Sequence, residues 1–184
     1  MAARFEIASR FADAGIPLPE RKTKYSAGYD MVAAEDVIIP SAFSTLLDFP
    51  QDVKYDPLTL DEMSDITNQK RAFKNTQKLR PTLISTGVKC KLDPGTYLEL
   101  SVRSSAPLKH WIILANGVGV IDADYYNNPS NEGEIFFQVI NLSPYDLVIR
   151  KGEAIGQGII HSYLIAENDV SEGLRMGGFG STNE

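Results

Sequence analysis

The order of apolar and polar residues along the chain predicts a structure built mostly from short β-strands. Segments rich in Val, Ile, Phe, Tyr and Thr recur, and several alternate in polarity, as strands with one buried face do. Turn-forming residues such as Asp93-Pro94-Gly95 separate them. Strands are expected at residues 5–9, 36–39, 45–49, 82–90, 96–102, 111–115, 134–141, 147–149 and 154–165. Many short strands separated by turns favour an all-β sandwich or barrel over a layered α/β fold.

One segment departs from this pattern and predicts a helix inserted between two strands. Apolar residues recur at near-helical spacing from Leu60 to Phe73, and charged residues fill most of the other positions. Thr59 and Glu62 match a capping box, in which the hydroxyl and the carboxylate each satisfy a free backbone N–H. The sequence therefore predicts an amphipathic surface helix within an insertion at about residues 51–78.

Length, composition and charge narrow the class of protein. A chain of 184 residues with 43% hydrophobic content fits one domain, residues 1–184. The net charge of -6 argues against a direct nucleic-acid binder, which needs basic residues to neutralise phosphates. A single nucleotide is not excluded, because a local cluster of cations and backbone N–H groups is enough to bind it. With one cysteine and no apolar run long enough to span a membrane, we expect a soluble cytoplasmic protein.

Two segments carry groups suited to phosphate. Arg103 with Ser104 and Ser105 follows an expected strand, and an Arg fork and hydroxyls match phosphate oxygens. The C-terminal arm, about residues 171–184, contains the glycine-rich stretch RMGGFGST, whose backbone can wrap an anion and whose Phe179 can stack on a base. Taken alone, the Arg103 segment is explained about equally well as a surface loop, and a mobile, solvated terminus is the favoured explanation of the arm.

The stretch NGVGVIDADYY, residues 116–126, looks like a strand that enters a turn and presents Asp122 at a hairpin edge. A carboxylate there can orient a water molecule for attack on phosphorus. Gly119 allows a ligand close to the backbone, and Asn116 either caps a turn or holds a base edge. Ordinary turn chemistry is the commoner explanation of such Asp residues.

Two further polar residues stand in otherwise apolar or turn segments. Asp30 lies in AGYDMVAA, so as a half-buried carboxylate it either pairs with an Arg or faces the water shell of a metal. Gln157 ends the segment KGEAIGQ, where it can donate to a phosphate or simply face solvent from a strand.

Taken together and in order, these segments resemble the five motifs of the homotrimeric dUTPase family. The motifs are AGYDMVAA, VRSSAPLKH, NGVGVIDADYY, KGEAIGQ and RMGGFGST. The resemblance runs from about Leu18 to the C-terminus and is interrupted by the insertion, which suggests a phage or prophage member. It implies a jelly-roll-like all-β fold, a homotrimer with active sites shared between subunits, and hydrolysis of dUTP to dUMP and pyrophosphate by attack of water on the α-phosphorus.

The resemblance also implies roles for individual residues. Asp122 would orient the attacking water, Asn116 and the adjacent backbone would bind uracil, and the Tyr125 ring would exclude a 2′-hydroxyl. Ser104 would bind oxygens between the α- and β-phosphates, and the arm would close over the site from another subunit. Mg²⁺ would be held mainly by the triphosphate, with Asp30 acting through water. The full substrate-binding set is Arg103, Ser104, Ser105, Asn116, Gly119, Val120, Tyr125, Phe136, Gln157, Arg175, Phe179, Gly180, Ser181 and Thr182.

The chain departs from the family pattern at several points. Trp111 stands where the family usually has glycine, and the stretch after Tyr125 is longer than the family's tight turn. The arm is also one residue shorter between Arg175 and its glycines than in the family pattern.

Two rival functions stay open from the sequence. The first is a dCTP deaminase of related fold, which also carries an Arg-Ser-Ser stretch. That enzyme needs a glutamate acting on the base, whereas this chain has Ile-Asp-Ala-Asp-Tyr. The second is a dUTPase-like regulatory module that binds a protein partner through the insertion at residues 51–78.

Overall fold

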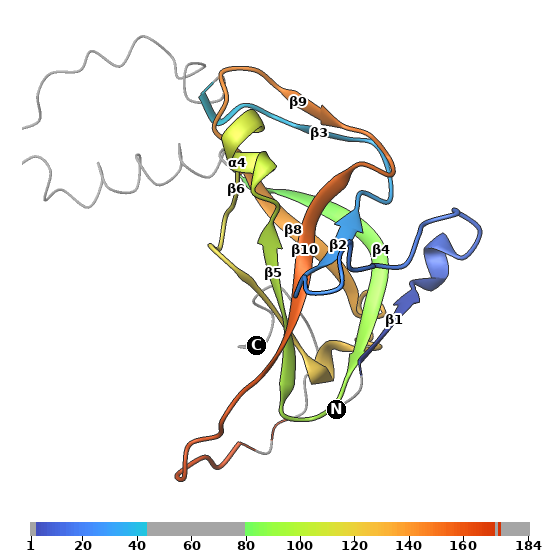
Figure 1. The fold of residues 1–184 in the computed structure, drawn as a ribbon, viewed down its shortest axis with the longest axis vertical. Coiled ribbons are helices and arrows are strands. Elements are labelled where there is room, and N and C mark those ends of the chain that lie inside the picture. Colours follow the sequence, from blue (N-terminus) through green and yellow to red (C-terminus); the bar gives the residue numbers. More distant parts are fainter. Residues whose placement is uncertain (1–2, 44–79, 172, 174–184) are drawn as a thin grey trace, which may run out of the picture.

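The computed structural model describes residues 3–43, 80–171 and 173, and within them the chain forms two four-stranded antiparallel sheets and a two-stranded ribbon (Figure 1). The first sheet has the order β1 (Ala3–Ile7), β4 (Thr82–Leu92), β8 (Glu134–Asn141) and β6 (Ile112–Leu114). The second has the order β2 (Tyr29–Val32), β10 (Ala154–Ser162), β5 (Thr96–Val102) and β7 (Gly119–Asp122). The ribbon pairs β3 (Val37–Ile39) with β9 (Leu147–Ile149).

Apolar residues at alternate positions of both sheets form one buried cluster. On β5, Leu98 and Leu100 are almost fully buried, and on β8 the same holds for Ile135, Phe137 and Val139. Since side chains alternate between the two faces of a strand, each sheet turns one face to the shared core, although β4 is buried on both faces from Ile84 to Cys90. The architecture is the all-β, jelly-roll-like fold expected from the sequence.

Cys90 belongs to the same cluster, and its burial raises the pKa of the thiol to about 12. A thiol in this apolar setting stays protonated at neutral pH, so it is a poor nucleophile and a poor metal ligand.

Most expected strands are present with differences at their ends, and the structure contains two elements that the sequence did not predict. Ser9, expected in a strand, begins the 3₁₀ turn η1 (Ser9–Phe11), and β10 ends at Ser162. The strand β2 and the short helix α4 (Ser105–His110) were not expected. The expected strand at residues 45–49 and the inserted helix lie outside the described residues. No helix in the described ranges is long and apolar enough to cross a membrane.

Candidate active site

The register of the second sheet brings three of the sequence motifs side by side. Gln157 on β10 pairs with Asp30 on β2 and with Ser101 on β5. Residues directly opposite each other in a sheet share a face, and this row lies on the face turned away from the core. The Gln157 amide donates a hydrogen bond of 3.3 Å to the Ser101 hydroxyl. Segments far apart in the sequence therefore place polar side chains together at the end of β5.

Arg103 completes this cluster one residue beyond β5. Its guanidinium lies 3.8 Å from the Asp30 carboxylate, whose side chain is only 14% exposed, while that of Arg103 is 44% exposed. Of the two alternatives for Asp30, the structure shows the pairing with an Arg. At 3.8 Å the contact is looser than a hydrogen bond, so it leaves Arg103 donors for an anion.

The two serines that follow Arg103 lead into α4, and Ala106 donates a backbone hydrogen bond of 2.9 Å to the Arg103 carbonyl. Ser104 occupies the N-cap position, yet its hydroxyl makes no capping hydrogen bond, and the residue is exposed. A hydroxyl that is not committed to the helix is suited to bind a ligand next to Arg103.

The third motif lies on β7, at the edge of the same sheet. Gly119 pairs with Leu100 and Asp122 pairs with Tyr97. Val120 and Asp122 therefore share the outer face with Ser101, and Val120 is 54% exposed. Asp122 ends the strand, as the sequence predicted, and is half-buried.

The structure accounts for two residues of this motif, Gly119 and Asn116, without any ligand. A side chain at Gly119 would meet Leu100 at 3.1 Å, so close packing of β7 on β5 favours glycine there, apart from any ligand. Asn116 is exposed at the turn before β7, where its carbonyl accepts a hydrogen bond of 2.8 Å from the Val118 N–H. The turn leaves the Asn116 side chain at the surface.

Directly after Asp122 the chain forms the 3₁₀ turn η2 (Ala123–Tyr125). Tyr125 is buried, with 5% of its surface exposed, and its hydroxyl accepts a hydrogen bond of 2.6 Å from the Asn131 amide. A ring held in this way is a rigid surface beside the end of β7.

The cluster of Asp30, Ser101, Arg103 and Gln157 lies at one end of β5, and Asp122 lies at the other. Arg103 follows the last residue of β5, whereas Asp122 pairs near the first, so at ~3.3 Å per residue the two are roughly 20 Å apart. Figure 1 shows α4 at one end of β5 and the chain after β7 reaching the other end. Glu99 lies between them on the same face and would repel a phosphate. One chain does not bring these groups to a single substrate.

The remaining predicted residues are placed as follows. Phe136 lies on β8 in the first sheet, opposite Ser85, and the Arg10 guanidinium lies 5.8 Å from its ring centre. Within one chain it is therefore not part of either cluster on the second sheet. The five predicted residues of the arm lie outside the described residues; they are Arg175, Phe179, Gly180, Ser181 and Thr182.

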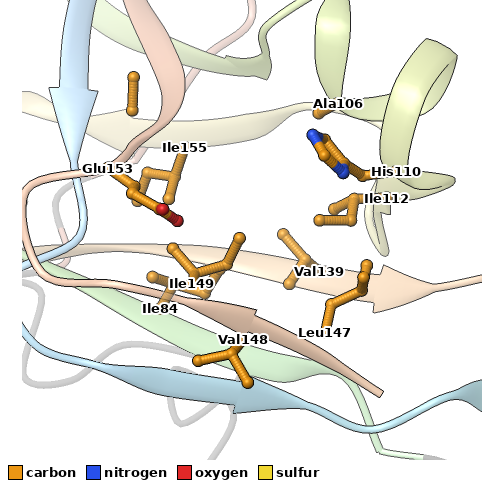
Figure 2. Close-up of a pocket in the computed structure, with 11 residues that line it drawn as sticks. Ile84, Ala106, His110, Ile112, Val139, Leu147, Val148, Ile149, Glu153 and Ile155 are labelled. Carbon is orange, nitrogen blue, oxygen red and sulfur yellow. The ribbon is translucent and has the colours of Figure 1, made fainter. Parts of the chain in front are cut away.

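A pocket of about 290 Å³ lies elsewhere, between α4, β6, β9 and the start of β10 (Figure 2). Aliphatic side chains cover most of its wall, and His110 and Glu153 face it from opposite sides. No predicted site residue lines it. A triphosphate carries several negative charges, so an apolar pocket with one carboxylate and one imidazole does not suit it.

Comparison with known proteins decides the family. A family model described as dUTPase matches residues 67–183. A deoxyuridine 5′-triphosphate nucleotidohydrolase of Lactococcus lactis is 38% identical over 180 residues, which cover 97% of this chain and 95% of the relative. The chain belongs to the dUTPase family.

Solved structures agree with this assignment. The dUTPase from Streptococcus mutans is 32% identical, with a TM-score of 0.65, and the match covers 89% of this chain and 98% of that one. A dUTPase from phage phi11 of S. aureus has a TM-score of 0.60 at 17% identity, covering 95% and 98%. The phage likeness supports the dUTPase fold but not a phage origin for this chain.

Trp111 adopts the backbone conformation that a glycine favours. It ends α4 with φ of 55° in the left-handed region, and its N–H bonds to the Ala106 carbonyl. The resemblance expected glycine here, and the turn has kept the glycine geometry while carrying an indole that is 63% exposed. Left-handed backbone costs a non-glycine residue roughly 1–2 kcal/mol, so this turn is strained.

We expect Trp111→Gly to raise the free energy of unfolding by about 0.5–1 kcal/mol, because relief of the strain exceeds the greater flexibility of unfolded glycine. Urea unfolding at one fixed protein concentration measures the change. Trp111→Ala is the matched control, because it removes the indole but keeps the Cβ atom. A gain in the alanine variant equal to that in the glycine variant would show that the backbone is not the cause.

The loop of residues 126–133, which the resemblance predicted to be longer than the family's tight turn, makes side-chain contacts with distant parts of the fold. Glu132 accepts hydrogen bonds of 2.9 Å from both the N–H and the hydroxyl of Ser9, and it forms an ion pair with Lys89, whose side chain is only 9% exposed. Lys89 also donates 2.9 Å to Asn127. The Lys89 ammonium, and then Ser9, lower the pKa of Glu132 to about 2, so the carboxylate stays ionised at neutral pH.

Sequence reasoning noted the length of the 126–133 loop but missed these partners. Ser9, Lys89 and Glu132 lie far apart in the chain, and each alone is an ordinary polar residue. The only available signal was local: Lys89 is the one charged residue expected inside a strand that is otherwise buried. A buried charge needs a partner, and the loop supplies it.

Proposed function

We propose that this dUTPase hydrolyses dUTP to dUMP and pyrophosphate in the cytoplasm, by attack of water on the α-phosphorus, and that Asp122 orients that water. The observation that carries the proposal is the position of Asp122. It ends β7 on the outer face of the second sheet, directly before the turn that carries Tyr125. A carboxylate at that point accepts a proton from water while the adjacent strand and ring hold the nucleoside.

We place the nucleoside against β7 and Tyr125. The exposed Asn116 and the backbone near Gly119 and Val120 offer donors and acceptors to the uracil edge. The buried Tyr125 ring would lie under the deoxyribose and leave no room for a 2′-hydroxyl. Because Tyr125 is packed and hydrogen-bonded, it cannot easily move aside for a ribonucleotide.

We place the triphosphate at the other cluster, next to Arg103. The exposed Ser104, with Ser105 and Gln157, would bind its oxygens. The arm residues Arg175, Phe179, Gly180, Ser181 and Thr182 would complete the site, with Phe179 stacked on uracil. Arg103 and hydroxyl groups stabilise charge on the phosphates, which is most of what phosphoryl chemistry asks of a protein.

Mg²⁺ fits this scheme as an ion held mainly by the substrate. No three His, Cys, Asp or Glu side chains of the described residues gather into a group that could hold a metal. Asp30 alone, beside Arg103, would reach such an ion through water. When bound, Mg²⁺ would neutralise part of the triphosphate charge.

The separation of the two clusters supports an active site shared between subunits. Asp122 of one subunit would meet Arg103 of a neighbour, because roughly 20 Å along β5 divides these residues within a chain. A contact between two different surfaces repeats from subunit to subunit and must close into a ring to stay finite. We propose the homotrimer as that ring.

A nucleotide panel tests the proposed function. We expect pyrophosphate release from dUTP with Mg²⁺, and at least a hundredfold slower release from UTP, dTTP and dCTP. UTP adds a 2′-hydroxyl and dTTP adds a 5-methyl group, whereas dCTP presents an amino group in place of the uracil O4 carbonyl. Pyrophosphate and ammonia are measured for each nucleotide. Equal rates with dUTP and UTP would contradict the placement of Tyr125, and ammonia release from dCTP would indicate a deaminase instead.

A further inference from the structure

Asn131 holds the hydroxyl of Tyr125, and its amide is oriented by a second contact. The Asn131 Nδ2 donates a hydrogen bond of 2.6 Å to the Tyr125 hydroxyl. Its Oδ1 accepts a hydrogen bond of 3.1 Å from the Gly133 N–H. An amide has one acceptor and one donor end, so the Gly133 N–H fixes which end faces the ring. Residue 131 must therefore present a hydrogen-bond acceptor to the Gly133 N–H and a second polar group to the Tyr125 hydroxyl.

The 126–133 loop keeps Asn131 in this place. The Tyr125 carbonyl accepts a hydrogen bond of 3.1 Å from the Asn128 N–H. The Asn128 carbonyl accepts a hydrogen bond of 2.7 Å from the Glu132 N–H. Gly133 has φ of 76°, and a Cβ atom there would lie 2.4 Å from the Tyr125 carbonyl oxygen. The loop thus folds back tightly on the residue whose ring it holds.

The far side of the loop is fastened to the first sheet. Glu132, next to Asn131, is bound by Lys89 on β4 and by Ser9, as described above. Tyr126 is also held, because its hydroxyl donates 2.7 Å to Glu6 on β1. Rigid elements on both flanks leave the Asn131 amide little freedom to follow a ring that turns away.

We propose that Asn131 is a positioning residue for sugar selectivity: its hydrogen bond to Tyr125 fixes the ring that excludes a 2′-hydroxyl. This inference rests on the proposed function, in which Tyr125 lies under the deoxyribose. Without the hydrogen bond, the ring can tilt and admit UTP more readily. Asn131 touches no substrate and acts only through Tyr125.

The test is the ratio of kcat/KM for dUTP to kcat/KM for UTP, in the full chain with Mg²⁺. Asn131→Ala is expected to lower the ratio roughly three- to tenfold, as for loss of one partly buried hydrogen bond to the residue that discriminates between the sugars. Tyr125→Phe should lower it similarly, and the double variant should lower it no further, because the same hydrogen bond is missing. Ser130→Ala, in the same loop but bonded to Asn128, should leave the ratio unchanged.

Asn131→Asp is the rescue variant. One carboxylate oxygen still accepts from the Gly133 N–H, and the other accepts a hydrogen bond from the Tyr125 hydroxyl. Most of the selectivity should therefore return. A variant that merely lowers the folded fraction reduces both kcat values equally and leaves the ratio unchanged, so the ratio separates positioning from stability.

Each outcome either supports or overturns the positioning role of Asn131. A wild-type ratio retained in Asn131→Ala, or a loss in Asn131→Asp as large as in Asn131→Ala, would overturn the inference while the proposed function stands. Failure of the wild-type chain to prefer dUTP over UTP would overturn both this inference and the placement of Tyr125 under the deoxyribose, whereas absence of dUTP hydrolysis would overturn the proposed function itself. A loss in Asn131→Ala with recovery in Asn131→Asp supports the positioning role.

Discussion

Asp122→Asn is expected to reduce kcat for dUTP by about a thousandfold, within the range of a lost general base. The amide has nearly the same shape as the carboxylate, so β7 and the following turn should be preserved, but an amide cannot accept a proton from water. At 1.36 kcal/mol per tenfold, this is about 4 kcal/mol of barrier. Pyrophosphate release measures the loss, and binding of a non-hydrolysable imido analogue of dUTP checks that the site still forms.

Asp124→Asn is the matched control for this experiment. It makes the same chemical change two residues further on, at an exposed position within η2. We expect turnover within about twofold of wild type, because surface substitutions rarely have large effects. A thousandfold loss in Asp124→Asn, or full activity in Asp122→Asn, would move the catalytic role away from Asp122.

The second large effect concerns how the site is assembled. Asp122→Asn and Arg103→Ala homo-oligomers should each be nearly inactive, since each lacks one half of every site. If subunits share sites, subunits of the two variants mixed by unfolding and refolding should regain about a quarter of wild-type activity. That fraction follows because random 1:1 mixing gives each site an intact Asp122 and an intact neighbouring Arg103 with about that frequency.

Mixing without exchange of subunits is the control, and it should restore nothing. Activity that stays absent after refolding of the mixture, while refolded wild type recovers, would show that Asp122 and Arg103 act within one chain. That result would contradict the separation of roughly 20 Å along β5 as the basis of a shared site.

Most of the architecture could be predicted because a strand with one buried face requires apolar and polar residues to alternate in the sequence. The long strands β4, β5, β8 and β10 carry the strongest alternation or apolar content, and all four were expected. The helix α4 has six residues, too few for a periodic apolar face, and none of them is buried, so no pattern could reveal it. The residues around Asp30 in β2 were noted as mostly apolar, but the strand has only four residues, which is shorter than a clear strand signal.

For the candidate site, the sequence predicted the residues but not their arrangement in space. Sequence order identified Asp30, Arg103, Gln157 and Asp122, and the register of the second sheet shows which of them are neighbours. That Asp122 lies far from Arg103 in one chain depends on the pairing of β5 with β7, which local sequence does not record. The contacts of Glu132 with Ser9 and Lys89 could not be predicted either, because they join three segments that only the folded chain brings together.

Hydrolysis of dUTP in ¹⁸O-labelled water tests the central claim most directly, because it shows which phosphorus the water attacks. The account predicts one ¹⁸O atom in dUMP and none in pyrophosphate for a single turnover, with the labelled product formed about a thousandfold more slowly by Asp122→Asn. Label in pyrophosphate would place the attack on the β-phosphorus and contradict the proposed mechanism.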